Sequence, residues 1–204
     1  MHTLSAWPAR PLQMAIDDAP PDDEVLVRAA AGADPAARAL AFDALYQRYF
    51  TRIYAYLRAR TANQEDAADL TQQVFLRALD ALPRYRLGSV PVASWLFRIA
   101  RNAAIDFHRR SRDTLAWDLL PVECQPRAGD TATTAILANE DRAYLRLLLE
   151  PLSPETREML ALRFSAGLSC GEIAAVLGKG ESAVKKRLAR AIQTLKERSN
   201  AIAR

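Results

Sequence analysis

Residues 168–198, LSCGEIAAVLGKGESAVKKRLARAIQTLKER, decide the fold. Ser169 and Glu172 have the spacing of a capping box, in which each side chain hydrogen-bonds the backbone amide of the other at a helix start. Gly178 then permits a tight turn, because glycine readily adopts positive φ. A second helix is predicted from about residue 181 to residue 198. The stretch therefore predicts a short helix, a glycine turn and a long helix.

The second of these helices is expected to be apolar inside and basic outside. Its inner face is predicted to consist of Val184, Leu188, Ala191 or Ile192, and Leu195. Between Lys179 and Arg198, seven basic residues stand against two acidic ones. This arrangement is typical of a helix-turn-helix, which places its second helix in the major groove of DNA. A basic face that is merely solvated is the alternative, but it does not account for the capping box, the turn and the apolar stripe together.

The rest of the chain also has helical periodicity, without strand alternation or internal repeats, so the fold class is predicted to be all-α. Further helices are predicted at about 22–31, 35–60, 64–82, 94–110, 136–150 and 153–164. The middle of the chain loses this periodicity and is rich in turn-forming and polar residues, which indicates a linker. The predicted organisation is a disordered tail (1–21), two small helical domains (22–112 and 139–200) and an irregular linker (113–138).

Composition excludes several classes of protein. The 204 residues include only two Cys and two His, which are too few for a disulfide framework and unsuited to a His/Cys zinc site. No phosphate-binding loop or activated nucleophile is apparent, so neither a cofactor, a metal nor an enzymatic activity is predicted. No apolar run approaches the roughly 20 residues of a membrane span, and the first twenty residues lack the features of a signal peptide. A cytoplasmic protein without membrane insertion is therefore expected.

Two segments of the N-terminal domain are candidate binding surfaces. The helix predicted at 64–82 turns a polar, slightly acidic face outward, which solvation alone explains, although it also suits a protein partner. Residues 94–112 instead interleave Trp95, Phe97 and Phe107 with five arginines. Aromatic rings offer stacking faces for unpaired bases, and arginines attract backbone phosphates. Trp95 also fits a buried helical stripe, so both roles are open for it.

Two other functions are compatible with parts of the sequence. The first is a stand-alone helix-turn-helix regulator with an N-terminal dimerisation domain, which would bind palindromic sites as a dimer. The second is a metal-dependent nuclease with Asp66, Asp69 and Asp106 as ligands. The nuclease is disfavoured because these acids are expected to open helices or pair with arginines, and no His accompanies them.

Three motifs, in chain order, resemble those of the sigma-70 family. Residues 66–78, DAADLTQQVFLRA, resemble the D-x-x-D-L-x-Q-E-x-F helix of region 2.2. Residues 94–110, which begin SWLFRIARN, resemble regions 2.3 and 2.4. Residues 152–195 resemble region 4. Because no region-3 domain separates these motifs, the chain is identified as a member of the extracytoplasmic-function (ECF) group.

The resemblance implies a sigma factor that binds core RNA polymerase, through its β′ clamp and β subunits, and directs initiation at promoter DNA. It also implies an anti-sigma factor as a partner. The residues it assigns to polymerase binding are Asp69, Gln72, Gln73 and Phe75. Those it assigns to the minus-10 element are Tyr85, Arg86, Ser89, Trp95, Arg98, Asn102, Asp106, Arg109 and Arg110. Those it assigns to the minus-35 element are Lys179, Ser182, Lys185, Lys186, Arg187 and Arg190.

Among the positions at which the sequence departs from the family pattern, two change the charge. Gln73 stands where the family usually has Glu, which removes one charge from the polymerase contact. We expect this to weaken the contact by no more than about 1 kcal/mol, because exposed ion pairs contribute little. Lys186 stands where the family usually has Ser, and the added charge predicts a steeper salt dependence of DNA binding.

Overall fold

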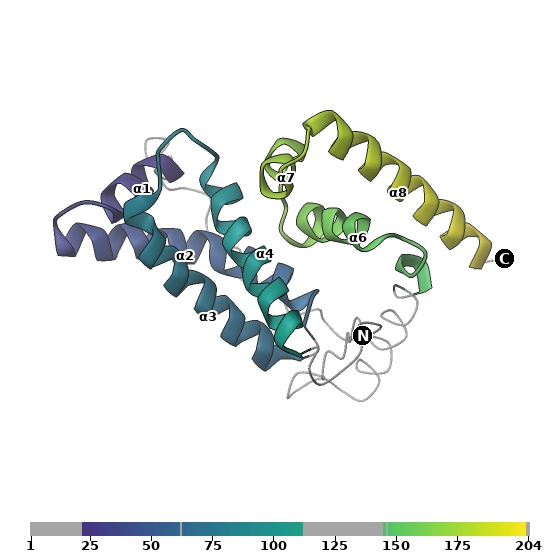
Figure 1. Cartoon of the computed structure of the whole chain (residues 1–204), viewed down its shortest axis with the longest axis horizontal. Helices are drawn as coiled ribbons and strands as arrows, with labels where there is room; N and C mark the ends of the chain where they lie inside the picture. Colours follow the sequence, from purple (N-terminus) through teal and green to yellow (C-terminus); the bar gives the residue numbers. More distant parts are fainter. Residues whose placement is uncertain (1–21, 62, 112–144, 146, 203–204) are drawn as a thin grey trace, which may run out of the picture.

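The computed structural model forms two helical bodies (Figure 1), and it describes residues 22–61, 63–111, 145 and 147–202. Every regular element in these ranges is a helix, so the prediction of an all-α fold is confirmed. The predicted tail and linker, and the start of the helix predicted at 136–150, lie outside the described residues.

The N-terminal body is a bundle of α-helices. They are α1 (Asp23–Ala30), α2 (Pro35–Arg58), α3 (Gln64–Ala81) and α4 (Val92–Ser111), with a 3-10 turn at Leu82–Arg84 after α3. Asp34 caps α2 by accepting a hydrogen bond from the Ala36 amide at 3.0 Å, and Pro35 occupies the first helical position. Asn63 caps α3 through the Asp66 amide at 2.7 Å. Each side chain supplies an acceptor for a backbone amide that the start of the helix leaves unpaired.

The C-terminal body contains the predicted glycine turn. Its elements are α6 (Pro154–Leu160), a π-helical turn (Ala161–Ser165), α7 (Cys170–Leu177) and α8 (Glu181–Ile202). The sequence predicted a single α-helix through Phe164, and this is wrong in the last turn. There the Ala166 amide donates to the Ala161 oxygen (3.1 Å), and the Leu168 amide donates to the Leu162 oxygen (3.0 Å). The wider turn has a packing reason, because it allows both of these leucines to be fully buried.

The hydrophobic core is continuous between the two bodies. Tyr56 of α2 and Phe97 of α4 are fully buried, and their rings meet edge-on with centroids 5.6 Å apart. Met159 and Leu162 of the C-terminal body belong to the same cluster of buried side chains. Packing of α4 against α7, and of α2 against the π-helical turn, joins the two halves (Figure 1). The bodies are therefore docked on each other in this conformation.

Glu158 of α6 is the polar centre of the contact between the bodies. Its side chain is 8% exposed, accepts a hydrogen bond from the Tyr56 hydroxyl at 2.6 Å, and forms an ion pair with Arg60. The Nε atom of Arg101 lies 3.9 Å from the same carboxylate. Burial raises the pKa of the Tyr56 hydroxyl well above 10, with the Arg60 charge opposing this shift and Glu158 adding to it. All three polar partners of Glu158 belong to the N-terminal body.

Three further side chains of the N-terminal body donate hydrogen bonds to backbone oxygens of the C-terminal body. The pairs are Arg52 Nε to Ala166 (2.7 Å), Ser94 Oγ to Glu172 (3.2 Å) and Arg98 Nε and Nη2 to Ala175 (2.9 and 2.5 Å). Together with Glu158, these bonds give the contact between the bodies a set of specific polar pairs in addition to its apolar core.

Candidate DNA-binding and protein-binding surfaces

The helix-turn-helix forms as the sequence predicts. Ser169 Oγ accepts the Glu172 amide at 3.2 Å, and Glu172 Oε2 accepts the Ser169 amide at 2.7 Å, so both bonds of the capping box are present. Gly178 ends α7 with φ of 65°, the left-handed conformation that favours glycine. The sequence offered either Ala191 or Ile192 for one core position on the inner face of α8. In the structure, Ala191 is the buried residue. The turn therefore fixes α8 with its basic residues outward.

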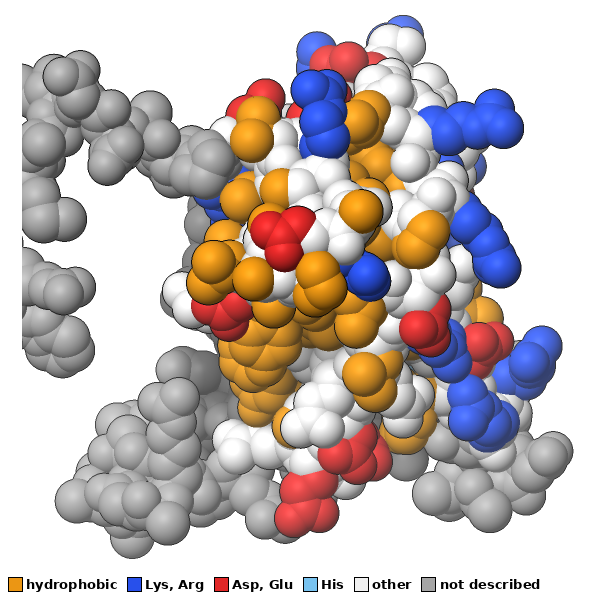
Figure 2. Space-filling model, turned by 90° about the vertical axis from the view of Figure 1, so that its left-hand side faces the viewer, with side chains coloured by type: hydrophobic (Ala, Val, Ile, Leu, Met, Phe, Trp, Pro, Cys, Tyr) orange, Lys and Arg blue, Asp and Glu red, His pale blue; other side chains and the backbone are white. Residues whose placement is uncertain are grey.

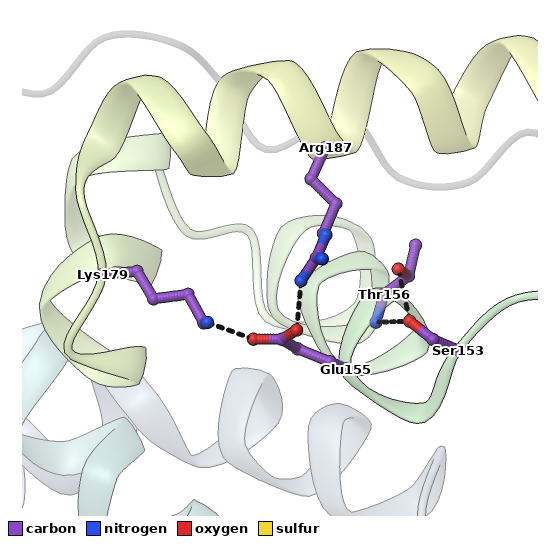
Figure 3. Close-up of polar contacts among 5 residues, drawn as sticks. All are labelled: Ser153, Glu155, Thr156, Lys179 and Arg187. Atoms are coloured by element: carbon purple, nitrogen blue, oxygen red, sulfur yellow. Dashed lines mark hydrogen bonds and ion pairs between the residues drawn. The ribbon is translucent and has the colours of Figure 1, made fainter.

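The predicted minus-35 residues are all exposed, and they lie in the turn or on α8. Their electrostatic surroundings differ. Lys185 pairs with Glu181, one helical turn earlier, at 2.6 Å. Lys179 and Arg187 both contact the carboxylate of Glu155, which lies on α6 (Figure 3).

Sequence reasoning missed Glu155. It lies 32 residues before Arg187, and no periodic or local motif connects two positions at that distance. Its only local signal is an acid in the first turn of a predicted helix, which the positive helix end explains by itself. The ion pairs arise only because the helix-turn-helix folds the start of α6 against α8.

The predicted minus-10 residues do not form one open surface in this conformation. The guanidinium of Arg98 is bonded to the Ala175 oxygen at the end of α7, so docking engages it. Trp95 is half-buried, and its ring lies 4.9 Å from that of Tyr85. The Tyr85 hydroxyl donates to the Val90 oxygen at 2.6 Å. This packing supports a structural role for Trp95 and Tyr85, and their contact with DNA stays a prediction.

The other minus-10 candidates lie in the turn before α4 or along its C-terminal half. Before the helix, Arg86 and Ser89 are exposed in a turn that contains Gly88 with φ of 76°. Asn102 is exposed near the middle of α4, and Arg109 and Arg110 are exposed at its C-terminal end. Asp106 lies between Arg77 (3.6 Å) and Arg109 (3.4 Å), which fits its predicted pairing with arginines.

The outer face of α3 carries the predicted polymerase-binding residues Asp69, Gln72 and Gln73, and all three are exposed. Phe75 is different, because its ring is buried 4.6 Å from that of Tyr46, so it supports the helix from beneath. Leu76, 63% exposed, adds an apolar group to the outer face. Figure 2 views the molecule from the side of α1 and shows hydrophobic side chains gathered at the left and centre of this face, with most Lys and Arg toward its right side and top. Such a mixed surface suits a protein partner.

The carboxylates of the alternative nuclease hypothesis do not form a metal site. Asp66 accepts a hydrogen bond from the Asn63 side chain at 2.9 Å, and Asp106 lies beside arginines. In the part of the chain that the structure describes, no three His, Cys, Asp or Glu side chains are grouped as metal ligands. Among the helices of that same part, none has both the length and the apolar character needed to cross a membrane.

A helix-turn-helix with a basic second helix, docked on a helical body with its own polar outer face, defines a two-domain all-α protein of the helix-turn-helix class. Residues 45–114 match the family described as sigma-70 region 2, and residues 142–195 match the one described as sigma-70 region 4. The chain belongs to the sigma-70 family, in the group of ECF RNA polymerase sigma factors.

Two relatives and one solved structure illustrate the similarity. The ECF RNA polymerase sigma factor BldN of Streptomyces coelicolor is 34% identical over 84% of this chain, and the chain spans 63% of BldN, less than two thirds of its length. The ECF RNA polymerase sigma factor SigD of Mycobacterium tuberculosis is 36% identical over 71% of this chain and 70% of SigD. The structure of CnrH in complex with the cytosolic domain of CnrY has a TM-score of 0.64 at 27% identity, covering 88% of this chain and 97% of CnrH.

Proposed function

We propose that this chain is a sigma factor that binds core RNA polymerase and directs it to promoter DNA, acting in the cytoplasm. It supplies specificity and carries no catalytic activity of its own, because the polymerase performs the chemistry. The observation that carries the proposal is the pairing of two surfaces in one chain. These are the exposed polar face of α3 and the basic outer face of α8, which a capping box and Gly178 hold outward.

In this proposal α3 binds the polymerase, while α8 contacts the minus-35 element and α4 the minus-10 element. Docking engages two nitrogens of Arg98 with the Ala175 oxygen, and separation of the two bodies before or during promoter binding would release the whole guanidinium for DNA. The chain between them keeps the second body at high effective concentration once the first has bound. Captured unpaired bases then offset the cost of unstacking, which is a few kcal/mol.

An inhibitory protein partner is part of the proposal. CnrH was solved with the cytosolic domain of CnrY, and this chain is similar to CnrH over most of its length. We propose that a protein of the anti-sigma class binds this chain and keeps it from the polymerase. Its identity would be found by co-purification with the full-length chain.

Run-off transcription with core polymerase and a pool of genomic promoters tests the proposed function. We expect initiation at a defined set of sites, and loss of that activity when Lys186 and Arg190 are both replaced by Ala. Lys196→Ala, which removes an exposed cation farther along α8, is the matched control and should retain activity. A chain that forms a dimer, binds palindromic duplexes and never programmes the polymerase would instead support the stand-alone regulator.

A further inference from the structure

Glu155 lies in the first turn of a capped helix of the helix-turn-helix body. Ser153 caps α6 by accepting the Thr156 amide at 3.3 Å, and its hydroxyl also contacts the Thr156 hydroxyl at 2.8 Å (Figure 3). Glu155 is the second residue of the helix that starts here. From that position its carboxylate meets the Lys179 ammonium from the turn and the Arg187 guanidinium from α8. The three charges therefore come from three different elements.

The contacts of Glu155 resemble those that a DNA phosphate makes. One carboxylate oxygen binds Lys179 and the other binds Arg187, as two phosphate oxygens do with basic side chains. The Lys179 contact, and then the Arg187 contact, lower the pKa of Glu155, so the carboxylate is charged at neutral pH. All three side chains are accessible, with 38% of Glu155 exposed, 38% of Lys179 and 45% of Arg187. An incoming anion can therefore compete for the two cations.

The neighbouring pair between Glu181 and Lys185 is of a different kind. Both residues lie on α8 at i and i+4, and their side chains are 52% and 62% exposed. Such an exposed pair within one helix contributes little to stability and does not link α8 to another element. Glu155 instead reaches α8 from another helix and engages two of the cations expected to contact DNA.

We propose that Glu155 is an internal competitor for DNA phosphate, which limits how strongly the helix-turn-helix binds any duplex. The inference rests on the proposed DNA-binding role of α8. Phosphate contacts carry no sequence information, so the restraint acts equally on promoter and non-promoter DNA. Its consequence is to reduce trapping of the free chain on the large excess of non-promoter sites.

The test is the salt dependence of duplex binding by the full-length chain carrying Glu155→Gln. Two fluorescent duplexes of equal length are used, one a promoter selected by transcription and the other a scrambled sequence. Release of Lys179 and Arg187 adds one or two phosphate contacts, so the slope of log K against log salt steepens by about 1–2. The advantage of Glu155→Gln over the parent therefore shrinks about 3- to 12-fold between 50 and 200 mM salt. We expect this change to be the same on both duplexes.

Glu197→Gln is the matched control for net charge. Glu197 is exposed on α8, and its carboxylate accepts a hydrogen bond from the side-chain amide of Gln193 at 2.7 Å. This variant should keep the parent slope. Arg187→Met is then introduced into the parent and into Glu155→Gln, and it should weaken binding more in the second background, where Arg187 is available to phosphate. Thermal unfolding verifies that each variant is folded.

Each outcome has a definite meaning. Weaker binding by Glu155→Gln would show that Glu155 positions the cations and does not compete for them, which overturns the inference. A slope equal to that of Glu197→Gln, or an effect on the promoter duplex alone, also overturns it. In both cases the parent still binds DNA, so the proposed function stands. If the folded parent fails to bind either duplex at low salt, the DNA-binding role of α8 is itself wrong.

Discussion

Replacing Glu158 by Gln is expected to shift the two helical bodies from the docked to the separated arrangement. The side chain is 8% exposed, and its polar partners Tyr56, Arg60 and Arg101 all lie across the contact. Glutamine keeps the size of the side chain but offers one acceptor oxygen in place of two. Either Tyr56 or Arg60 is then left facing an amide NH₂ group. The substitution should therefore act on docking, with little effect on the fold of either body.

The size of the effect follows from the geometry. A hydrogen bond to a charged group contributes about 1.5–3 kcal/mol, and breaking a fully buried ion pair costs about 3–5 kcal/mol. We expect the cost of about 1.5–3 kcal/mol for losing a hydrogen bond to a charged group, and not the larger cost of breaking a fully buried ion pair. The reason is that the Arg60 side chain is 19% exposed and can be rehydrated. A change of 1.5–3 kcal/mol corresponds to a rise of about 10- to 150-fold in the ratio of separated to docked molecules.

Single-molecule fluorescence energy transfer measures this ratio directly. The dyes are attached to cysteines introduced at the exposed positions 38 and 193, one on each body, after Cys124 and Cys170 are replaced by Ser. Glu197→Gln, which has the same change in charge at an exposed site, should leave the ratio unchanged. Ratios for Glu158→Gln within twofold of the parent, with both proteins folded, would refute the assigned role of Glu158 in docking.

Three further predictions concern stability, measured by urea unfolding. Ser169→Ala removes a helix cap and should lower the free energy of unfolding by about 1 kcal/mol, whereas unchanged stability would mean that the capping box is not formed. Gly178→Ala should cost about 1–2 kcal/mol, because φ is 65° and the space around the position is open, while Gly180→Ala, also in open space and without positive φ, should cost far less. Burial raises the pKa of Tyr56, so above pH 10 this residue ionises only in the unfolded chain, and stability should fall with pH by about 1.4 kcal/mol per unit. Below pH 10 the contribution is constant, and a slope that Tyr56→Phe leaves unaltered would contradict the assignment.

Local chemistry explains what the sequence could predict about the fold. Asp34, Asn63 and Ser169 were recognisable as caps because the residues that they bind lie two or three positions away. The apolar stripe of α8 was recognisable from its helical spacing, and the structure selects Ala191 where the sequence left two choices open. The π-helical turn was not recognisable, because it results from burying Leu162 and Leu168 together after the chain reverses direction.

The candidate surfaces were predicted only in part, for the same reason. Exposure of the α8 cations follows from the period of one helix, and the structure confirms it. Ion pairs with Glu155, and the engagement of Arg98 by α7, join residues 24 to 77 positions apart. The sequence assigned Phe75 to a binding surface from a motif alone, whereas its ring packs beneath that surface. Contacts of this kind depend on tertiary packing, so they cannot be predicted from the helical periodicity of the sequence.

Arg52, Ser94 and Arg98 all donate to main-chain oxygens of the other body. Every amino acid offers the same carbonyl, so residues around these acceptors can diverge without abolishing the hydrogen bonds. During evolution, the helix-turn-helix body is therefore free to change its sequence while the N-terminal body keeps an unaltered set of donors. In a chimaera that combines the N-terminal body of one paralogue with the C-terminal body of another, the two bodies should therefore still dock. The condition is that the exchanged segment keeps an acid at position 158.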